Sequence, residues 1–156
     1  MIYPDPATLA QSFRTTHGLI RHHTAGLTHA DSVTQPPFEG NCLNWVLGHI
    51  INGRNEALGY LDAQSVWKET EAARYRTGAP PINGPQDGLP LSRLLDDLDA
   101  TQKLLEERLD AIPAEAFSAV VETRFGQRPV GQHIAGLHWH ETYHTGQLEL
   151  LRQLKA

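Results

Sequence analysis

The sequence predicts an all-α fold: one domain over residues 1–156, built as a bundle of four long antiparallel helices with a long connection between helices two and three. Because a connection of this length can cross the end of the bundle, neighbours that are not consecutive in the sequence are also expected. Four segments repeat apolar residues every three or four positions, which is the spacing of one helix face. Prolines and glycines gather between the second and third segments. The chain has 156 residues, 40% of them hydrophobic and 20% charged, which is enough for one core.

The first helix is expected from Asp5, a candidate N-cap before Pro6, to about residue 28. Its apolar stripe consists of Leu9, Phe13, His17, Ile20 and Leu27. The second helix is expected from Asn41, another candidate cap, to about Asp62. Its apolar side consists of Leu43, Leu47, Ile50, Ile51, Leu58 and Leu61.

The connection over residues 63–90 is expected to lack regular structure. Its second half contains Pro80, Pro81, Gly84, Pro85, Gly88 and Pro90. Long connections in compact domains are commonly functional or mobile. The first half of the connection contains Trp67 and Tyr75. We expect one of them either to line the cavity of a metal site or to anchor the connection to the helices.

The third helix is predicted by leucines at three- and four-residue spacing over residues 91–112, and it ends before Pro113. The segment "SAVVETRFGQRP" has no helical period and suits a short extended piece. The fourth helix is expected from Val130 to about Leu154. It contains Gly131, Gly136 and Gly146, each of which costs roughly 1 kcal/mol relative to alanine. Close approach of a neighbouring backbone would explain these glycines.

The stretch "HWHETYHTGQLELL" carries three histidines of the fourth helix. His140 and His144 are one turn apart on the same helix face, so they can bind one metal ion together. His133 shares this face but lies two turns, or roughly 10 Å, from His140, too far to bind the same ion. His138 points to the opposite side.

A third ligand has to come from another helix, and His49 in "WVLGHIINGRNE" is the best candidate. It lies in the middle of a helix with Asn52 and Glu56 on its side, where an unpartnered histidine is unfavourable. His17, in the apolar stripe of the first helix, is the alternative third ligand. It could otherwise contact a ligand without binding the metal itself. A helix that merely carries surface or hydrogen-bonded core histidines is the other interpretation.

The motifs "WVLGHI" and "HETYHTGQL", in a chain of four long helices, resemble the DinB/YfiT-like family of metal-dependent proteins. The resemblance covers nearly the whole chain in element order. It implies that His49, His140 and His144 hold a divalent metal inside a four-helix bundle. Members with understood activity are thiol transferases or isomerases, so the resemblance also implies a small-molecule substrate such as a low-molecular-weight thiol.

Three neutral imidazoles leave a divalent ion with an open coordination position, which is typical of catalytic sites. Zinc is the expected metal, with nickel, iron or manganese as alternatives, because imidazole suits them all. Water or a thiol bound to such an ion becomes a nucleophile, as a hydrolase or an S-transferase requires. The rival functions are a non-catalytic bundle with a structural metal and a protein that binds a small molecule in a cavity.

Four polar residues lie beside the candidate ligands in the expected helices. Asn52, Glu56 and Gln147 are placed to orient a substrate or a ligand imidazole. Glu141 points about 100° away from His140, so it suits a bond to a ligand on the adjacent helix or a packing contact. Ordinary polar residues between helices are the alternative for all four.

Composition argues against several classes of partner. Acidic residues number 18 against 13 basic ones and no Lys/Arg run occurs, so a nucleic-acid ligand is not expected. No apolar run approaches the roughly 20 residues that span a bilayer, and "MIYPDPATLA" lacks the apolar core of a secretion signal.

The single cysteine, Cys42, suits a reducing cytoplasm and a buried position, with a thiol near a site as the alternative. A homodimer through a flat apolar helix face is expected.

Overall fold

The structure is a computed structural model that describes residues 3–155. It is mostly helical, as the sequence predicts. Its elements are α1 (Pro6–Thr24), α2 (His29–Ser32), α3 (Leu43–Tyr60), α4 (Glu69–Arg74), α5 (Leu91–Ala111), α6 (Ala114–Ser118), β1 (Val120–Thr123), β2 (Gly126–Pro129), α7 (Val130–Leu151) and a final 3-10 turn, η1 (Arg152–Leu154). None of the helices within residues 3–155 combines the length and the apolar composition needed to cross a bilayer.

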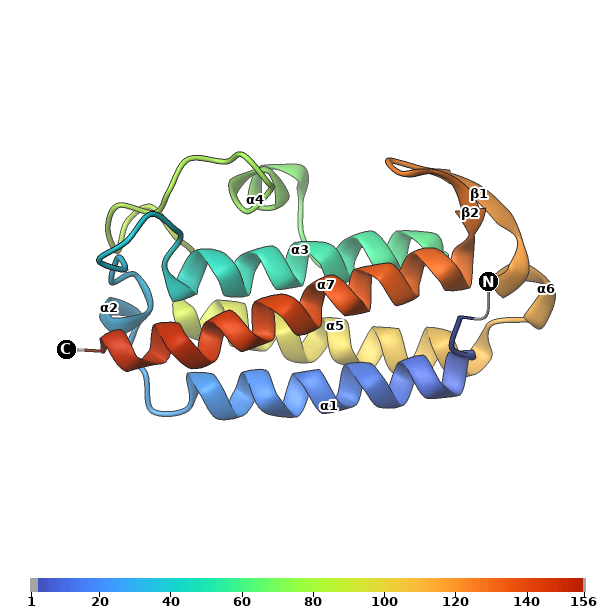
Figure 1. Cartoon of the computed structure of the whole chain (residues 1–156), viewed down its shortest axis with the longest axis horizontal. Coiled ribbons are helices and arrows are strands. Elements are labelled where there is room, and N and C mark those ends of the chain that lie inside the picture. Colours follow the sequence, from blue (N-terminus) through green and yellow to red (C-terminus); the bar gives the residue numbers. More distant parts are fainter. Residues whose placement is uncertain (1–2, 156) are drawn as a thin grey trace.

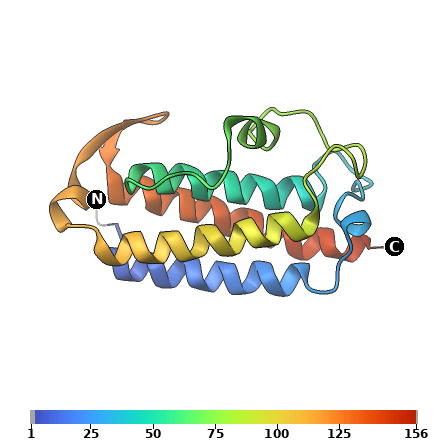
Figure 2. The ribbon, with the colours of Figure 1, turned by 180° about the vertical axis from the view of Figure 1, so that it is seen from behind.

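The four long helices lie side by side, and each packs against two others (Figure 1). α1 packs against α5 and α7, and α3 packs against the same two helices. α3 and α5 run in one direction while α1 and α7 run in the other, as seen from both sides (Figures 1 and 2). The expectation of antiparallel helices is therefore wrong for α3 and α5, because the segment between them returns along the helices before α5 begins. The expectation of neighbours that are not consecutive in the sequence is confirmed, since α1 packs against α5 and α7.

The ends of the first two long helices, α1 and α3, differ in how they are capped. The Asp5 carboxylate accepts a hydrogen bond of 2.7 Å from the Thr8 amide, so Asp5 caps α1 as predicted. α1 ends at Thr24, earlier than expected, ahead of Gly26 with its positive φ of 75°. Asn41 does not cap α3: the N-cap is Cys42, which makes no side-chain cap. Cys42 is fully buried among apolar side chains, as its small size allows.

A two-stranded hairpin occupies the segment for which an extended piece was predicted. β1 and β2 pair antiparallel, with Thr123 opposite Gly126. Gly126 has a φ of 83°, a conformation in which a residue with a Cβ is strained. The two residues between the strands, Arg124 and Phe125, form the tip of the hairpin, which folds back over the N-terminal end of α7 and the neighbouring part of α3 (Figure 1).

The glycines of α7 have different explanations from the expected backbone contact. A Cβ on Gly131 would lie 2.4 Å from the Phe117 ring and 2.5 Å from the Tyr3 ring, so Gly131 makes room for side chains. Nothing lies within 4 Å of a Cβ built on Gly136 or Gly146. The prediction of close backbone approach is wrong for these two positions, which face outward.

A buried polar layer separates two apolar clusters along the length of the helices. Arg54 on α3 is 1% exposed and Glu141 on α7 is 3% exposed. The Arg54 guanidinium donates two hydrogen bonds of 2.8 Å to the two carboxylate oxygens of Glu141. The hydroxyl of Thr16 on α1 donates to the same carboxylate. Glu141 therefore holds three helices together by a packing contact, one of the two roles considered for it.

The segment between α3 and α5, expected to lack regular structure, contains the short helix α4 and is anchored through its aromatic residues. The Trp67 indole donates a hydrogen bond of 2.7 Å to Asp97 on α5. The Tyr75 hydroxyl donates to Asn44 at 3.1 Å and accepts from the Leu89 amide at 2.7 Å. The Tyr75 ring lies directly on Gly48, where a Cβ would meet it at 2.2 Å. Of the two roles expected for Trp67, its contacts correspond to anchoring.

The contact between Gly48 and Tyr75 predicts a specific packing defect. In Gly48→Ala, the added methyl group occupies the space of the Tyr75 ring, so the ring and its segment have to move. We expect the free energy of unfolding in urea to fall by about 1–3 kcal/mol. Gly53→Ala on the same helix is the control, because nothing lies within 4 Å of its Cβ. An equal effect of both substitutions would contradict this role of Gly48.

Candidate metal centre

Three histidines from two helices meet in the middle of the structure. His49 comes from α3, and His140 and His144 come from α7, which packs against α3. One ring nitrogen from each lies within 4.8 Å of the others. The ring centroids are 4.4 Å apart for His140 and His144, 5.1 Å for His49 and His140, and 4.9 Å for His49 and His144. The structure thus brings together the three residues that the sequence singled out.

Hydrogen bonds outside the cluster set the orientation of two of the rings. The Nδ1 atom of His49 lies 2.7 Å from the Tyr75 carbonyl, which can only accept a hydrogen bond. The Nδ1 atom of His144 lies 2.6 Å from the Gln147 side-chain oxygen. Both Nδ1 atoms therefore carry the proton, and the Nε2 lone pairs are left for another partner. The Nε2 atoms of His140 and His144 face each other at 3.0 Å. Metal-binding histidines usually donate a hydrogen bond from the ring nitrogen that does not bind the metal, as Nδ1 of His49 and of His144 does here.

Aromatic side chains pack against the same rings. The Trp45 indole, one turn before His49, stacks on its imidazole at a centroid distance of 4.8 Å and an angle of 16°. Tyr143 packs edge-on against His144 at 5.1 Å. His49 and His144 are 7% and 9% exposed. The cluster is thus largely shielded from solvent by its neighbours.

Burial keeps the three imidazoles neutral. It is the main cause that lowers the pKa of His49 and His140, and it lowers the pKa of His144 to about 4. Neutral imidazoles with free lone pairs are the form that binds a divalent cation. The donor set, three neutral nitrogens that converge on one point, therefore fits such an ion.

The same pKa shift predicts an acid sensitivity of the metal-free protein. The pKa of His144 is about 4 in the folded chain and about 6.5 when unfolded, so the unfolded state binds more protons between these values. The free energy of unfolding should then fall as the pH falls from 7 to 5, by roughly 1–2 kcal/mol from this residue. Urea denaturation at both pH values measures it. His144→Gln, which has no such proton to gain, should show a smaller fall, and an identical fall would contradict the assignment.

Two other histidines lie outside this cluster. The Nε2 atom of His17 is 3.2 Å from a carboxylate oxygen of Asp99 on α5, so the structure does not bring His17 to the other imidazoles. This is a correction to its expected role as an alternative third ligand. Its place in the stripe of α1 gave no indication of which neighbouring helix it would face. His133 is bonded to Glu56 at 3.2 Å and does not join the cluster.

Two of the cavities lined by the histidine cluster are large enough for a small molecule. The first, of about 280 Å³, is lined by His144, Gln147 and mainly apolar groups such as Trp45, Tyr143 and Leu150. The second, of about 230 Å³, is lined mainly by polar residues, together with Gly53 and Leu137. The polar residues are His49, Asn52, Glu56, Arg76, Thr77, Arg124 and His140.

Sequence reasoning found Asn52, Glu56 and Gln147 but missed other residues around the cluster. Trp45 could have been found, because it lies one turn before His49 on the same helix. Tyr75 was expected to line a site or to anchor its segment, but its contact with His49 through the backbone carbonyl could not be foreseen. Arg124 could not have been found, because it lies at the tip of a hairpin, where no helical period applies. Only the fold brings these segments to the helices.

Comparisons with known proteins agree with these observations. The sequence model of the DinB superfamily matches residues 12–148. The crystal structure of a conserved protein from Enterococcus faecalis superimposes with a TM-score of 0.74 over 96% of this chain and 95% of that one. Since the two sequences are 17% identical, this likeness shows the fold alone. No curated protein sequence matches the chain.

The family model covers most of the sequence, from the middle of α1 to the last turns of α7, and so includes both histidine motifs. The resemblance identified from those motifs is confirmed, and the superfamily includes metal-binding members. The chain belongs to the DinB superfamily.

Proposed function

We propose that this protein is a metal-dependent enzyme that acts on a small molecule, as a thiol S-transferase or a hydrolase. In this proposal, the four long helices form a four-helix bundle of the DinB type. His49, His140 and His144 hold one divalent ion inside it, zinc in the first place, with nickel, iron or manganese as alternatives. The observation that carries the proposal is the convergence of three neutral imidazoles within 4.8 Å.

The number of ligands favours catalysis over a structural role. Within residues 3–155 the cluster of metal-binding side chains has three members, whereas structural zinc sites have four protein ligands. Cavities of about 280 and 230 Å³ reach these three residues, so a substrate has access to the remaining side of the site. A divalent ion held there would supply a nucleophile at neutral pH by lowering the pKa of a thiol or of water.

The residues around the imidazoles have roles that follow from their contacts. The Tyr75 carbonyl and the Gln147 side chain fix the rings of His49 and His144 by accepting from Nδ1. Trp45 covers one face of His49 and limits access of water from that side. The long connection between α3 and α5 contributes Tyr75 to the site. Preorganised ligands of this kind raise metal affinity, because less order has to be gained on binding.

Metal content and turnover test the proposal together. Elemental analysis of the purified protein should find about one divalent ion per chain. The conjugation of glutathione or cysteine to 1-chloro-2,4-dinitrobenzene and the hydrolysis of a nitrophenyl ester are then followed with and without chelator. We expect the wild-type protein to show one of the two activities. This activity should be lost with chelator and return with added metal, and the His49→Ala protein should show no activity under any of these conditions.

The rival functions predict different results in the same experiment. Stoichiometric metal without turnover in either assay would support a structural metal in a non-catalytic bundle. A protein that retains no metal would instead support small-molecule binding in a cavity.

We also propose that the protein is a cytoplasmic homodimer. An exposed stripe along α7 supports the dimer: Trp139, Tyr143 and Leu150 are 71%, 57% and 69% exposed, and Gly136 and Gly146 lie in the same stripe. Large exposed apolar side chains of this kind commonly mark an interface. The single cysteine, which excludes an internal disulfide, suits the reducing cytoplasm.

Light scattering at micromolar concentration checks the dimer. We expect twice the chain mass of 17.3 kDa for the wild type. Trp139→Glu should shift the protein to the mass of one chain, because a charge would be buried in the interface. Lys103→Glu on α5 is the control and should leave the mass unchanged. A wild-type mass of one chain would contradict the dimer.

A further inference from the structure

The polar cavity beside His49 and His140 is built by segments that are distant in the sequence. α3 and α7 contribute these two imidazoles, and α3 also contributes Asn52. The stretch after α4 contributes Arg76, and the tip of the β1–β2 hairpin contributes Arg124. Two guanidinium groups thus line the same cavity of about 230 Å³ as two of the candidate metal ligands.

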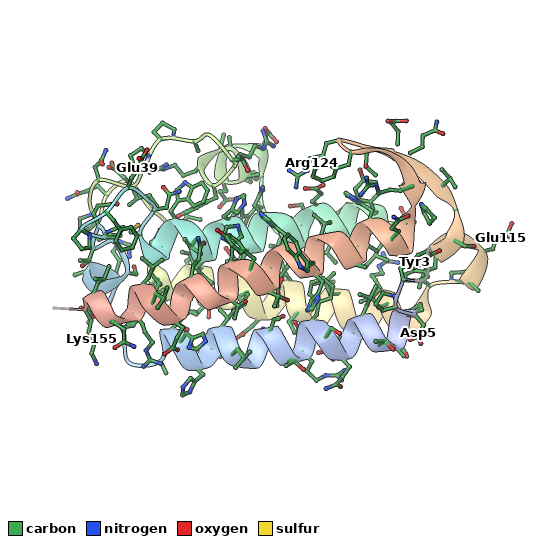
Figure 3. All side chains as sticks on the ribbon, in the orientation of Figure 1. Tyr3, Asp5, Glu39, Glu115, Arg124 and Lys155 are labelled. Atoms are coloured by element: carbon green, nitrogen blue, oxygen red, sulfur yellow. The ribbon has the colours of Figure 1, made fainter. Side chains whose placement is uncertain are left out.

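Arg124 is held over this cavity by the hairpin. Its tip is short and closed by the pairing of Thr123 with Gly126, whose carbonyl also accepts a hydrogen bond of 2.8 Å from the Thr123 hydroxyl. The Arg124 guanidinium lies over the Phe125 ring at 4.8 Å. Figure 3 shows its side chain below the tip of the hairpin, on the side that faces α3. Arg124 therefore belongs to a defined turn.

The two guanidiniums differ in whether their charge is already balanced. Arg76 makes two hydrogen bonds of 2.6 and 2.7 Å to the Glu69 carboxylate. Arg124 has no carboxylate partner within residues 3–155. The one carboxylate in the cavity lining is that of Glu56, which lies 3.2 Å from the buried imidazole of His133. Once a divalent ion is held by neutral imidazoles, the positive charges exceed the negative ones in this cavity.

We propose that this cavity is a binding subsite for the carboxylate of an anionic substrate, and that Arg124 pairs with that carboxylate. A guanidinium binds a carboxylate through two parallel hydrogen bonds, which fixes its orientation as well as its charge. The reacting group of the same molecule then lies toward His49 and His140, at the other side of the cavity. The subsite rests on the proposed function, because it places the substrate relative to the metal centre.

Three small thiols of similar length form a direct test. They are 3-mercaptopropionate with a carboxylate, 2-mercaptoethanol with a hydroxyl, and cysteamine with an ammonium group. The wild-type protein is loaded with Co²⁺, and binding of each thiol is titrated through the thiolate-to-cobalt absorption. We expect 3-mercaptopropionate to bind more tightly than 2-mercaptoethanol, and Arg124→Gln to reduce its affinity by roughly tenfold or more. The affinity for 2-mercaptoethanol should stay within about twofold.

A second arginine of the hairpin is the matched control. Arg128 also lies over the Phe125 ring, at 5.3 Å, and donates to the Phe125 carbonyl at 3.0 Å, but it does not line the cavity. Arg128→Gln removes the same charge from the hairpin, so it should leave the thiol affinities unchanged. An equal effect of Arg124→Gln and Arg128→Gln would overturn the proposal, because a general charge effect would then explain both.

The remaining outcomes separate this subsite from the function on which it rests. Equal affinity of the wild type for 3-mercaptopropionate and 2-mercaptoethanol would overturn the subsite and leave the thiol chemistry standing. Tighter binding of cysteamine would also overturn it, because Glu56 would then dominate the cavity. A Co²⁺-loaded protein that binds none of the three thiols would overturn the thiol branch of the proposed function, and the subsite with it.

Discussion

His49→Ala, His140→Ala and His144→Ala should each reduce divalent-metal affinity by at least about a hundredfold, since each removes one of three protein ligands. The loss arises because the three nitrogens converge on one point and no fourth ligand lies within the described cluster to replace one of them. Metal affinity is measured by competition with a chromogenic chelator, after circular dichroism has shown that each variant is folded. His49 is included because it comes from α3, whereas the other two ligands come from α7.

Two other histidines of the chain are the controls for this experiment. His22 is exposed near the end of α1, and His138 packs edge-on against Phe13 at 4.8 Å, outside the cluster. His22→Ala and His138→Ala should therefore retain wild-type metal affinity. If His140→Ala and His144→Ala bound metal stoichiometrically with wild-type affinity, the metal centre would be rejected, and α7 would be merely a histidine-rich helix.

The second large effect is expected at the buried ion pair. Arg54→Met leaves the Glu141 carboxylate 3% exposed and without its guanidinium. An uncompensated buried charge is strongly destabilising, so we expect the free energy of unfolding in urea to fall by about 3–5 kcal/mol. The double variant Arg54→Met with Glu141→Leu should recover much of this loss, because a buried pair replaced by apolar side chains is often neutral.

An exposed ion pair of similar geometry provides the comparison. Arg14 on α1 and Glu106 on α5 are joined at 3.0 Å, with side-chain exposures of 52% and 35%. Arg14→Met should change the free energy of unfolding by less than about 1 kcal/mol, because solvent screens the pair. An Arg54→Met protein within 1 kcal/mol of the wild type would show that water enters the polar layer and solvates Glu141.

The sequence was informative wherever a single helix contains the whole signal. The apolar period of residues 91–112 predicted α5, and the spacing of His140 and His144 put both imidazoles on one face of α7. His49 was selected because a histidine in the middle of an amphipathic helix needs a partner. Such inferences succeed because helical geometry turns distance along the chain into direction in space.

The same reasoning failed where the partner lies on another element. The period of α1 placed His17 on its apolar stripe, but only the packing of α1 against α5 puts it beside Asp99. For Glu141 the sequence predicted a bond to a ligand or a packing contact, but it did not identify the partner, which is Arg54 on α3. No rule based on spacing along one helix reaches across 87 positions.

By itself, the sequence determined that this protein is mostly helical, that it belongs with the DinB proteins, and which histidines are able to face one another. The tertiary structure decided that α3 and α5 run in the same direction, that the Tyr75 carbonyl orients His49, and that the hairpin brings Arg124 to the cavity. The physical reason is the range of the forces involved. Helical periods and caps arise from neighbours within a turn, whereas the course of a long connection is set by burial against helices distant in the sequence.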